Sequence, residues 1–303
     1  MNAIEIISLH KKYSNGKKAL NGINLEIPKG SFFGLLGPNG AGKTTTIGIL
    51  TGLVNPTSGK MKVFDFDPIK DFRETRKRIG LSSQEFNFDI FFTVEQILRL
   101  QAGYYGVPRK KTFERASIML ESFGLEDKKK SKPRELSGGM KRRLQIAKAL
   151  VHDPPIIILD EPTAGIDVEL RYKLWDYLNL INKKGKTILL TTHYIEEAEK
   201  LCDEIAIINN GKIIAQDKTD TLKNKIKEKE IILELSSSIH KNDLCDYSFS
   251  MKDNNLIIKS LKVEADLPKI IEKISFKNIN IKNIKINEPT LENVFLELTT
   301  NDK

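Results

Sequence analysis

Residues 37–45 read Gly-Pro-Asn-Gly-Ala-Gly-Lys-Thr-Thr, and this stretch decides how the chain folds around it. The apolar residues 32–36 before it predict a strand and residues 45–53 after it predict a helix, so the glycines occupy a strand-to-helix turn. Glycines let the backbone approach a polyphosphate with inward-pointing N–H groups, and the start of the helix adds partial positive charge. The stretch therefore predicts a phosphate-binding loop. The alternative, a glycine turn that merely opens a helix, is disfavoured by this strand-turn-helix context.

Two side chains of the loop carry the chemistry. Lys43 is placed to reach the β and γ phosphates, and the Thr44 hydroxyl can bind Mg²⁺. The second half of such a site follows the apolar residues 156–159 as Asp160 and Glu161. Phosphoanhydride cleavage needs Mg²⁺ on the phosphate oxygens and an oriented water, so Asp160 suits the metal and Glu161 the water. Gln84 ends a further predicted strand, 79–84, and a polar amide at a strand end is typical of a site.

Composition limits the alternatives. The chain has 303 residues, enough for two modest domains, and a formal net charge of +9 that is spread widely. The basic clusters 109–111 and 128–134 are interpreted as solvated loops, with anionic lipid headgroups as the alternative partner. No apolar run approaches the roughly 20 residues of a membrane span, and the first residues lack a signal sequence, so a cytosolic chain is expected. Cys202 and Cys245 have no metal-binding spacing and are expected to be free thiols.

The order of predicted elements indicates an α/β fold. Strands near 3–9, 20–27 and 60–63 predict an antiparallel opening, and residues 156–208 alternate strand and helix as a mostly parallel core sheet does. An all-α insertion is expected at about 86–150, with Thr93 and Thr112 as helix N-caps. We place a domain boundary between residues 225 and 226. Residues 226–303 are predicted to form a small α+β accessory domain.

Six motifs in this order resemble the ATP-binding subunit of ABC transporters. Beside the loop at 37–45 and Gln84, they are Leu136-Ser-Gly-Gly-Met140, residues 156–161, Ala164-Gly-Ile-Asp167 and His193. The third is the most diagnostic, because the loop and the acidic pair occur in many phosphate-loop proteins. Met140 stands where glutamine is common, and Ile166 where leucine is common; neither removes a group that the chemistry needs.

The resemblance implies two such domains packed head to tail, with ATP held between the loop of one and the third motif of the other. It also implies that Tyr13 stacks on adenine, that Asp167 bridges to the partner's loop, and that His193 bonds the γ phosphate. Tyr13 as an ordinary strand-end aromatic remains the alternative. The expected catalytic residues are Glu161, His193 and Gln84, and the expected Mg²⁺ ligands are Thr44, Gln84 and Asp160. The expected ATP-binding residues are Tyr13, Gly37, Pro38, Asn39, Gly40, Ala41, Gly42, Lys43, Thr44, Thr45, Ser137, Gly138 and Gly139.

Residues 192–199 and 288–296 resemble the branch of these ATPases that works with ABC-2 type permeases, often exporters of drugs or glycans. This implies an integral membrane permease as partner, a homodimer of the ATP-binding subunit, and a peripheral location on the cytoplasmic face of the inner membrane. No specific nucleic acid partner is expected. The alternative is a soluble ABC ATPase that acts in translation, on nucleic acid or in iron–sulfur assembly.

The aromatic residues near Gln84 leave two interpretations open. Phe86, Phe88, Tyr104 and Tyr105 either pack inside the helical insertion or line a groove for a short permease helix. In the second case a movement of Gln84 on ATP binding would tilt the insertion.

Overall fold

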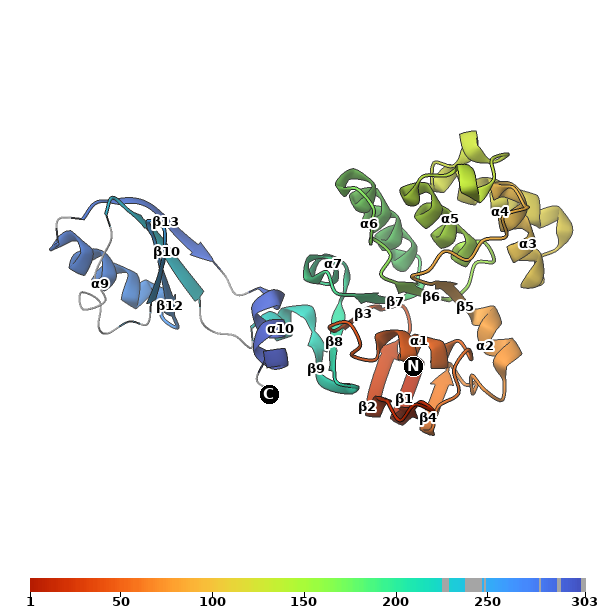
Figure 1. The fold of residues 1–303 in the computed structure, drawn as a ribbon, viewed down its shortest axis with the longest axis horizontal. Coiled ribbons are helices and arrows are strands. Elements are labelled where there is room, and N and C mark those ends of the chain that lie inside the picture. The colour runs from red at the N-terminus through yellow and green to blue at the C-terminus, as the bar shows by residue number, and fades with distance from the viewer. Residues whose placement is uncertain (225–228, 238–246, 248, 278, 288–289, 301–303) are drawn as a thin grey trace. The chain divides into compact units, whose positions relative to one another are not determined.

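The computed structural model describes residues 1–224, 229–237, 247, 249–277, 279–287 and 290–300. Backbone contacts divide the chain into two compact units, Met1–Thr219 and Asp220–Lys303 (Figure 1). The boundary expected between residues 225 and 226, and Cys245, lie outside the described residues. No helix in the described ranges is long and apolar enough to cross a membrane.

A six-stranded sheet forms the centre of the first unit. Its order is β5 (Ile79–Ser82), β6 (Ile156–Asp160), β7 (Thr187–Thr192), β3 (Phe32–Leu36), β8 (Glu204–Asn209) and β9 (Lys212–Lys218). The first five strands run parallel, and β9 returns antiparallel through a tight turn. Strands β3 and β6 are buried along their whole length, which explains their uninterrupted apolar sequence. Since parallel strands end at one edge, the segments after β3, β5, β6 and β7 meet there.

The predicted antiparallel opening is present as a second sheet, ordered β2 (Lys18–Pro28), β1 (Asn2–Lys12) and β4 (Ser58–Val63). Its apolar residues share one core with α1 (Lys43–Leu50) and one face of the central sheet. The sequence pattern predicts helices at 72–78, 168–183 and 195–201, and the structure has them as α2 (Phe72–Arg78), α6 (Val168–Lys183) and α7 (Ile195–Leu201). Helix α1 starts two residues earlier than the predicted 45–53 and ends at Leu50.

The predicted helical insertion consists of α3 (Val94–Tyr104), α4 (Arg109–Ser122) and α5 (Gly138–Leu150), with the 3-10 turns Glu126–Lys128 and Pro133–Glu135 between α4 and α5. In Figure 1 these helices lie on the opposite side of the central sheet from β1, β2 and β4. Thr93 caps α3 as predicted, in a reciprocal capping box with Gln96. The prediction that Thr112 is a helix N-cap is wrong. Pro108, whose fixed φ suits a helix start, precedes α4, and the Thr112 hydroxyl donates to the Arg109 carbonyl within the first turn.

The second unit is an antiparallel sheet ordered β11 (Phe249–Lys252), β12 (Asn255–Ser260), β10 (Lys229–Leu235) and β13 (Ile281–Asn287). Helix α9 (Val263–Ser275) contributes Ile270 and Ile274 to its core; α8 (Thr219–Lys223) precedes this sheet and α10 (Leu291–Thr300) follows it. The short strand β11 was not predicted, because four residues that alternate only partly give no strand signal. Strand β13 begins two residues later than the predicted 279–286.

An aromatic stack joins the helical insertion to the turn before β6. Tyr105, directly after α3, lies parallel to the ring of His152, with 3.7 Å between centroids and 9° between planes. Burial of the imidazole is the main cause that lowers the pKa of His152 from 6.5 to about 4; the charges of Arg115 and Lys186 add to this effect, and the Ile79 backbone and Asp153 oppose it. The folded protein therefore holds this histidine uncharged.

We expect this histidine to make folding sensitive to acid. Unfolded His152 binds a proton below pH 6.5, whereas folded His152 resists it down to about pH 4, so the stability it contributes is lost as pH falls between these values. His152→Phe keeps a ring against Tyr105 but cannot be protonated. Urea denaturation should find that wild type loses up to about 3 kcal/mol relative to this variant between pH 7 and pH 4. A stability difference that stays constant with pH would contradict a buried neutral imidazole.

Candidate active site

The phosphate-binding loop is pressed against two neighbouring strands. Gly42, the N-cap of α1, has φ +118°, a value that favours glycine, and a Cβ there would lie 2.9 Å from the Ala19 carbonyl oxygen on β2. At Gly37 a Cβ would lie 2.4 Å from the Ile208 carbonyl oxygen on β8. The glycines therefore allow a close backbone approach as well as the turn itself.

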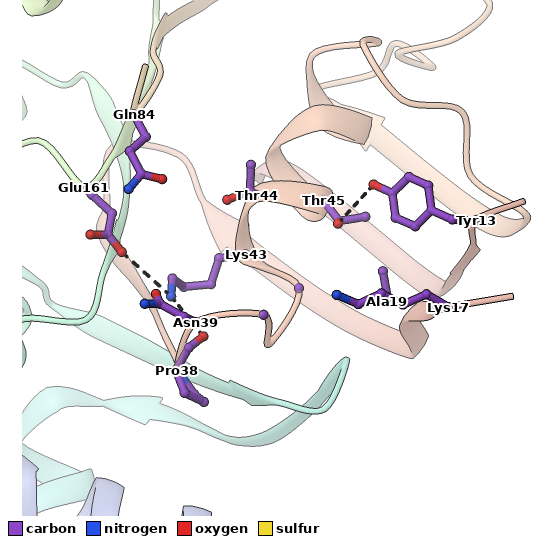
Figure 2. A pocket seen from close by; sticks show the side chains of 12 residues that line it. Tyr13, Lys17, Ala19, Pro38, Asn39, Lys43, Thr44, Thr45, Gln84 and Glu161 are labelled. Carbon is purple, nitrogen blue, oxygen red and sulfur yellow. Dashed lines mark hydrogen bonds and ion pairs between the residues drawn. The ribbon is translucent and has the colours of Figure 1, made fainter. Parts of the chain in front are cut away.

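A cavity of about 280 Å³ opens beside this loop. Figure 2 shows Tyr13 at one end and Glu161 with Gln84 at the other, and Lys43 points toward Glu161 between them. The lining residues are Tyr13, Lys17, Ala19, Pro38, Asn39, Gly40, Gly42, Lys43, Thr44, Thr45, Gln84 and Glu161. Most of the predicted residues of the loop are thus brought together with Tyr13, Gln84 and Glu161. Gly37 and Ala41 are the two predicted loop residues that do not line the cavity.

Lys43 is a buried cation held mainly by backbone carbonyls. Its Nζ donates to the carbonyl oxygens of Gly37, at 2.6 Å, and Pro38, at 3.2 Å, and lies 3.9 Å from Oε1 of Glu161. Burial lowers the pKa of Lys43, while the charges of Glu161 and Asp160 raise it. Carbonyl dipoles compensate a buried ammonium only partly, so an anionic phosphate group is a favourable additional partner for Lys43.

The two acidic residues after β6 have different surroundings. Asp160 lies opposite Thr191 in the parallel ladder and accepts a 2.5 Å hydrogen bond from its hydroxyl. Burial raises the pKa of Asp160, whereas the bond from Thr191 lowers it. Glu161 takes a left-handed backbone conformation, φ +52°, and its N–H donates to the Thr191 carbonyl. Asp160 therefore lies behind the cavity, and Glu161 turns into it.

Glu161 also meets the predicted histidine. His193, on the segment after β7, places Nδ1 2.6 Å from Oε2 of Glu161. Lys43 from the start of α1 and His193 from the end of β7 thus both contact Glu161, which follows β6 and is only 5% exposed. A carboxylate fixed at both oxygens and facing a polar cavity is suited to orient a water molecule and accept its proton.

Gln84 and Tyr13 reach the cavity from the segments that follow β5 and β1. Strand β5 ends at Ser82, so Gln84 does not end it as predicted and lies two residues beyond, although it does line the cavity. The physical reason is that Arg142 and Gln145 of α5 bond the Ser83 carbonyl, which directs the chain away from the sheet. The Tyr13 hydroxyl lies 3.3 Å from Oγ1 of Thr45.

The residues of the third motif lie away from this cavity. Ser137 caps α5 by accepting from the Met140 N–H at 3.3 Å, and Gly138 and Gly139 begin the helix. None of the three lines the cavity beside the loop, and Ser137 and Gly138 are exposed. Asp167 similarly caps α6 by accepting from the Leu170 N–H at 2.9 Å.

Several residues at the site were missed by sequence reasoning. Lys17 and Ala19 line the cavity because the hairpin between β1 and β2 returns them beside Tyr13. The Ser-Asn-Gly-Lys sequence at 14–17 is a turn signal that could have located them. Thr191, the partner of Asp160, could have been found by aligning the ends of the parallel strands. Gln145 gave no sequence signal, since its partners are backbone carbonyls.

The oxygen atoms at the cavity fit magnesium in combination with phosphate. Mg²⁺ prefers oxygen ligands and is usually bound by one or two protein groups together with substrate phosphates. Thr44 and Gln84 supply a hydroxyl and an amide oxygen to the cavity wall, whereas the predicted ligand Asp160 is buried and does not line the cavity. Within the described ranges, no group of three His, Cys, Asp or Glu residues could hold a metal ion alone. This donor set agrees with an ion that arrives with a nucleotide.

Comparisons with known proteins agree with this geometry. The family model for ABC transporters matches residues 20–164. The linearmycin resistance ATP-binding protein of Bacillus subtilis is 35% identical over 298 residues, which cover 95% of this chain and 96% of that protein. The Nod factor export ATP-binding protein I of Ralstonia nicotianae is 41% identical over 219 residues, 72% of this chain and 68% of the relative.

Solved structures give the same result. An ATP-binding subunit of an ABC transporter superposes with a TM-score of 0.69 at 30% identity, covering 74% of this chain and 92% of the other. A dimeric ATP-binding cassette bound to ADP and phosphate superposes with a TM-score of 0.67 at 29% identity, covering 71% and 98%. The fold and loop are thus those of a P-loop nucleotide triphosphatase. The chain belongs to the ABC transporter family, as an ATP-binding subunit with ATPase activity.

Two substitutions should separate binding from cleavage. Lys43→Ala removes the cation that faces the phosphates and should abolish ATP turnover with loss of ATP affinity, whereas Glu161→Gln should keep affinity and lower kcat by at least about 100-fold. Titration with a fluorescent ATP analogue and a phosphate-release assay measure the two quantities. Lys17→Ala, at the same cavity, is the control and should change kcat less than either. If Glu161→Gln hydrolyses ATP at the wild-type rate, the water-activating group lies elsewhere.

Proposed function

We propose that this chain is the ATP-hydrolysing subunit of an exporter, coupled to a separate integral membrane permease of the ABC-2 type. The observation that carries the proposal is the buried Glu161, held between Lys43 and His193 at the wall of the cavity. The names of the relatives, one for linearmycin resistance and one for Nod factor export, support an export role. The transported substrate is left open.

In this proposal each group of cavity residues has a separate role in ATP hydrolysis. The loop and Lys43 bind the phosphates, Tyr13 stacks on the adenine, and Glu161 accepts the proton of a water that Gln84 helps to orient. His193 bonds the γ phosphate and holds Glu161 in place. Thr44 and Gln84 would hold Mg²⁺ at the cavity wall, Asp160 would support it from behind the wall, and the bound ion would neutralise phosphate charge. The distribution in Figure 2, with Tyr13 and Glu161 at opposite ends, suits an elongated nucleotide.

We further propose that two copies close head to tail around ATP. Ser137, Gly138 and Gly139 would meet the γ phosphate bound to the partner's loop, because they begin a 13-residue helix whose N-terminus attracts anions. Their exposed position away from the chain's own cavity supports a role across an interface. The solved relative that is dimeric with ADP and phosphate is a precedent.

Dimerisation should therefore depend on uncleaved ATP. Glu161→Gln protein with ATP and Mg²⁺ should elute as a dimer in size-exclusion chromatography with light scattering, while wild type returns to monomer as ATP is consumed. Adding Ser137→Arg to Glu161→Gln should abolish the dimer without loss of ATP binding, since the new side chain occupies the interface. A Glu161→Gln protein that stays monomeric at saturating ATP would overturn the head-to-tail arrangement.

The permease contact is proposed at a groove between α3 and α4. This groove, of about 480 Å³, is lined by Phe92, Gln96, Arg99, Leu100, Gly103, Tyr104, Val107, Arg109 and Thr112. Tyr104 is 83% exposed and shares this groove with the partly exposed Phe92 and Leu100, and a contiguous apolar surface of this kind is typical of a protein contact. Tyr105 is instead packed against His152 and belongs to the interior. Phe86 and Phe88 stack on each other at 6.1 Å, with Phe86 half-exposed beside α5. We propose that Tyr104 and Phe92 receive a short permease helix.

Coexpression with the permease tests this contact. Tyr104→Ser combined with Phe92→Ser should abolish copurification of the permease while the isolated subunit keeps its basal ATPase rate, because both side chains lie outside the nucleotide cavity. Ile118→Ser, at an exposed apolar residue of α4 that does not line the groove, is the control and should retain the permease. Permease binding that survives the double substitution would place the contact on another surface.

We propose that residues 226–303, which fall within the second unit, form an accessory domain without catalytic groups. That unit has its own four-stranded sheet and its own apolar core, which supports this division. We place the protein peripherally on the cytoplasmic face of the inner membrane, attached through the permease.

A further inference from the structure

Helix α5 holds the backbone on both sides of Gln84. The side-chain Nε2 of Gln145 donates to the Ser83 carbonyl oxygen at 2.8 Å and to the Glu85 carbonyl oxygen at 2.7 Å. Arg142, one turn earlier, donates from Nη1 to the same Ser83 oxygen at 3.0 Å. The carbonyls that flank Gln84 thus face α5, while the Gln84 side chain lines the nucleotide cavity.

The orientation of the Gln145 amide follows from its partners. Two carbonyl oxygens can only accept, so the NH₂ group must face them, and a flipped amide would place oxygen against oxygen. The Ser83 hydroxyl lies 2.9 Å from Nε2 and donates to the Glu85 carbonyl at 3.1 Å, so it accepts from Gln145 and closes the network. Gln145 is 5% exposed and Arg142 is 4% exposed, which shields these bonds from competing water.

We propose that Gln145 is a positioning residue for ATP hydrolysis, acting through Gln84. This inference rests on the role proposed above for Gln84. Beyond Ser82 the chain has left the sheet, so the orientation of the Gln84 peptide depends on contacts other than the ladder. Donors fixed on a rigid helix supply those contacts on both sides of the residue. Lys148, one turn after Gln145, continues the row by donating to the Asn87 carbonyl at 3.1 Å.

The same helix begins with the third motif. Ser137 caps it, and Gln145 follows eight residues later, about 12 Å along the axis. A shift of Gln84 toward bound phosphate therefore pulls on a rigid body whose first turn carries Ser137 and Gly138. Gln145 connects the cavity beside the loop to the helix end that is proposed to meet the second nucleotide.

The isolated subunit allows a direct test with Gln145→Ala. We expect kcat to fall about tenfold while KM for ATP changes less than twofold, since the cradle around Lys43 is untouched and supporting groups of this kind typically contribute factors of 10 to 100. Folding should persist, because the Ser83 carbonyl retains Arg142 and the Glu85 carbonyl retains the Ser83 hydroxyl. Gln145→Glu, which has the same shape but offers acceptors to carbonyl oxygens, should be at least as slow.

Two controls separate positioning from stability. Arg143→Ala removes a side chain of the same helix that donates to the Phe123 and Gly124 carbonyls, so it should lower the melting temperature comparably while kcat stays within twofold. Gln145→Asn, which keeps a shorter amide donor, should fold and regain part of the lost kcat. It also replaces Gln145→Ala in the measurements if the alanine protein does not fold.

A double-mutant cycle decides the outcome. If Gln145 acts through Gln84, Gln84→Ala slows turnover, and adding Gln145→Ala to it produces no further loss. Losses that multiply, or a kcat loss matched by Arg143→Ala, would overturn the proposal and leave the role of Gln84 intact. A Gln84→Ala protein with wild-type kcat would instead refute the proposed role of Gln84, and the positioning role would fall with it.

Discussion

The site depends on one buried contact, that of Glu161 with Lys43 and His193. A carboxylate at this depth requires partners for both oxygens, and Lys43 and His193 approach one oxygen each. The three residues come from three different segments, so the contact exists only when β3, β6 and β7 are adjacent and parallel. The strand order, the glycine loop and the start of α1 together bring Lys43, Glu161 and His193 into contact.

Helical packing around the sheet solves a related problem. The segment after β5 leaves the ladder and continues into the insertion, so its carbonyls need hydrogen-bond donors other than the neighbouring strand. Helix α5 provides them from Arg142, Gln145 and Lys148. The insertion is thus attached to the sheet by side-chain bonds to backbone, together with the stack of Tyr105 on His152.

The sequence was most informative where residue type and backbone geometry are tied together. The loop at 37–45 predicted β3 and a helix directly after the turn, because glycine spacing reflects backbone conformation directly. Apolar runs predicted β6 and β7 because strands buried on both faces tolerate no alternation. The end of β5 was misplaced, since the bonds that redirect the chain come from Gln145, more than 60 residues away in sequence. Thr112 was misassigned because a residue suited to capping also fits a first helical turn, and Pro108 decided between the two.

The backbone of Glu161 has a consequence for how such a protein can change over time. A left-handed conformation at a residue with a side chain costs about 1 kcal/mol or more, and glycine would remove that cost. Glycine would also remove the buried carboxylate and its need for partners. Selection for thermal stability alone would therefore favour loss of this side chain. The strained backbone at Glu161 therefore indicates a requirement other than stability, which the unstrained residues of the core do not indicate.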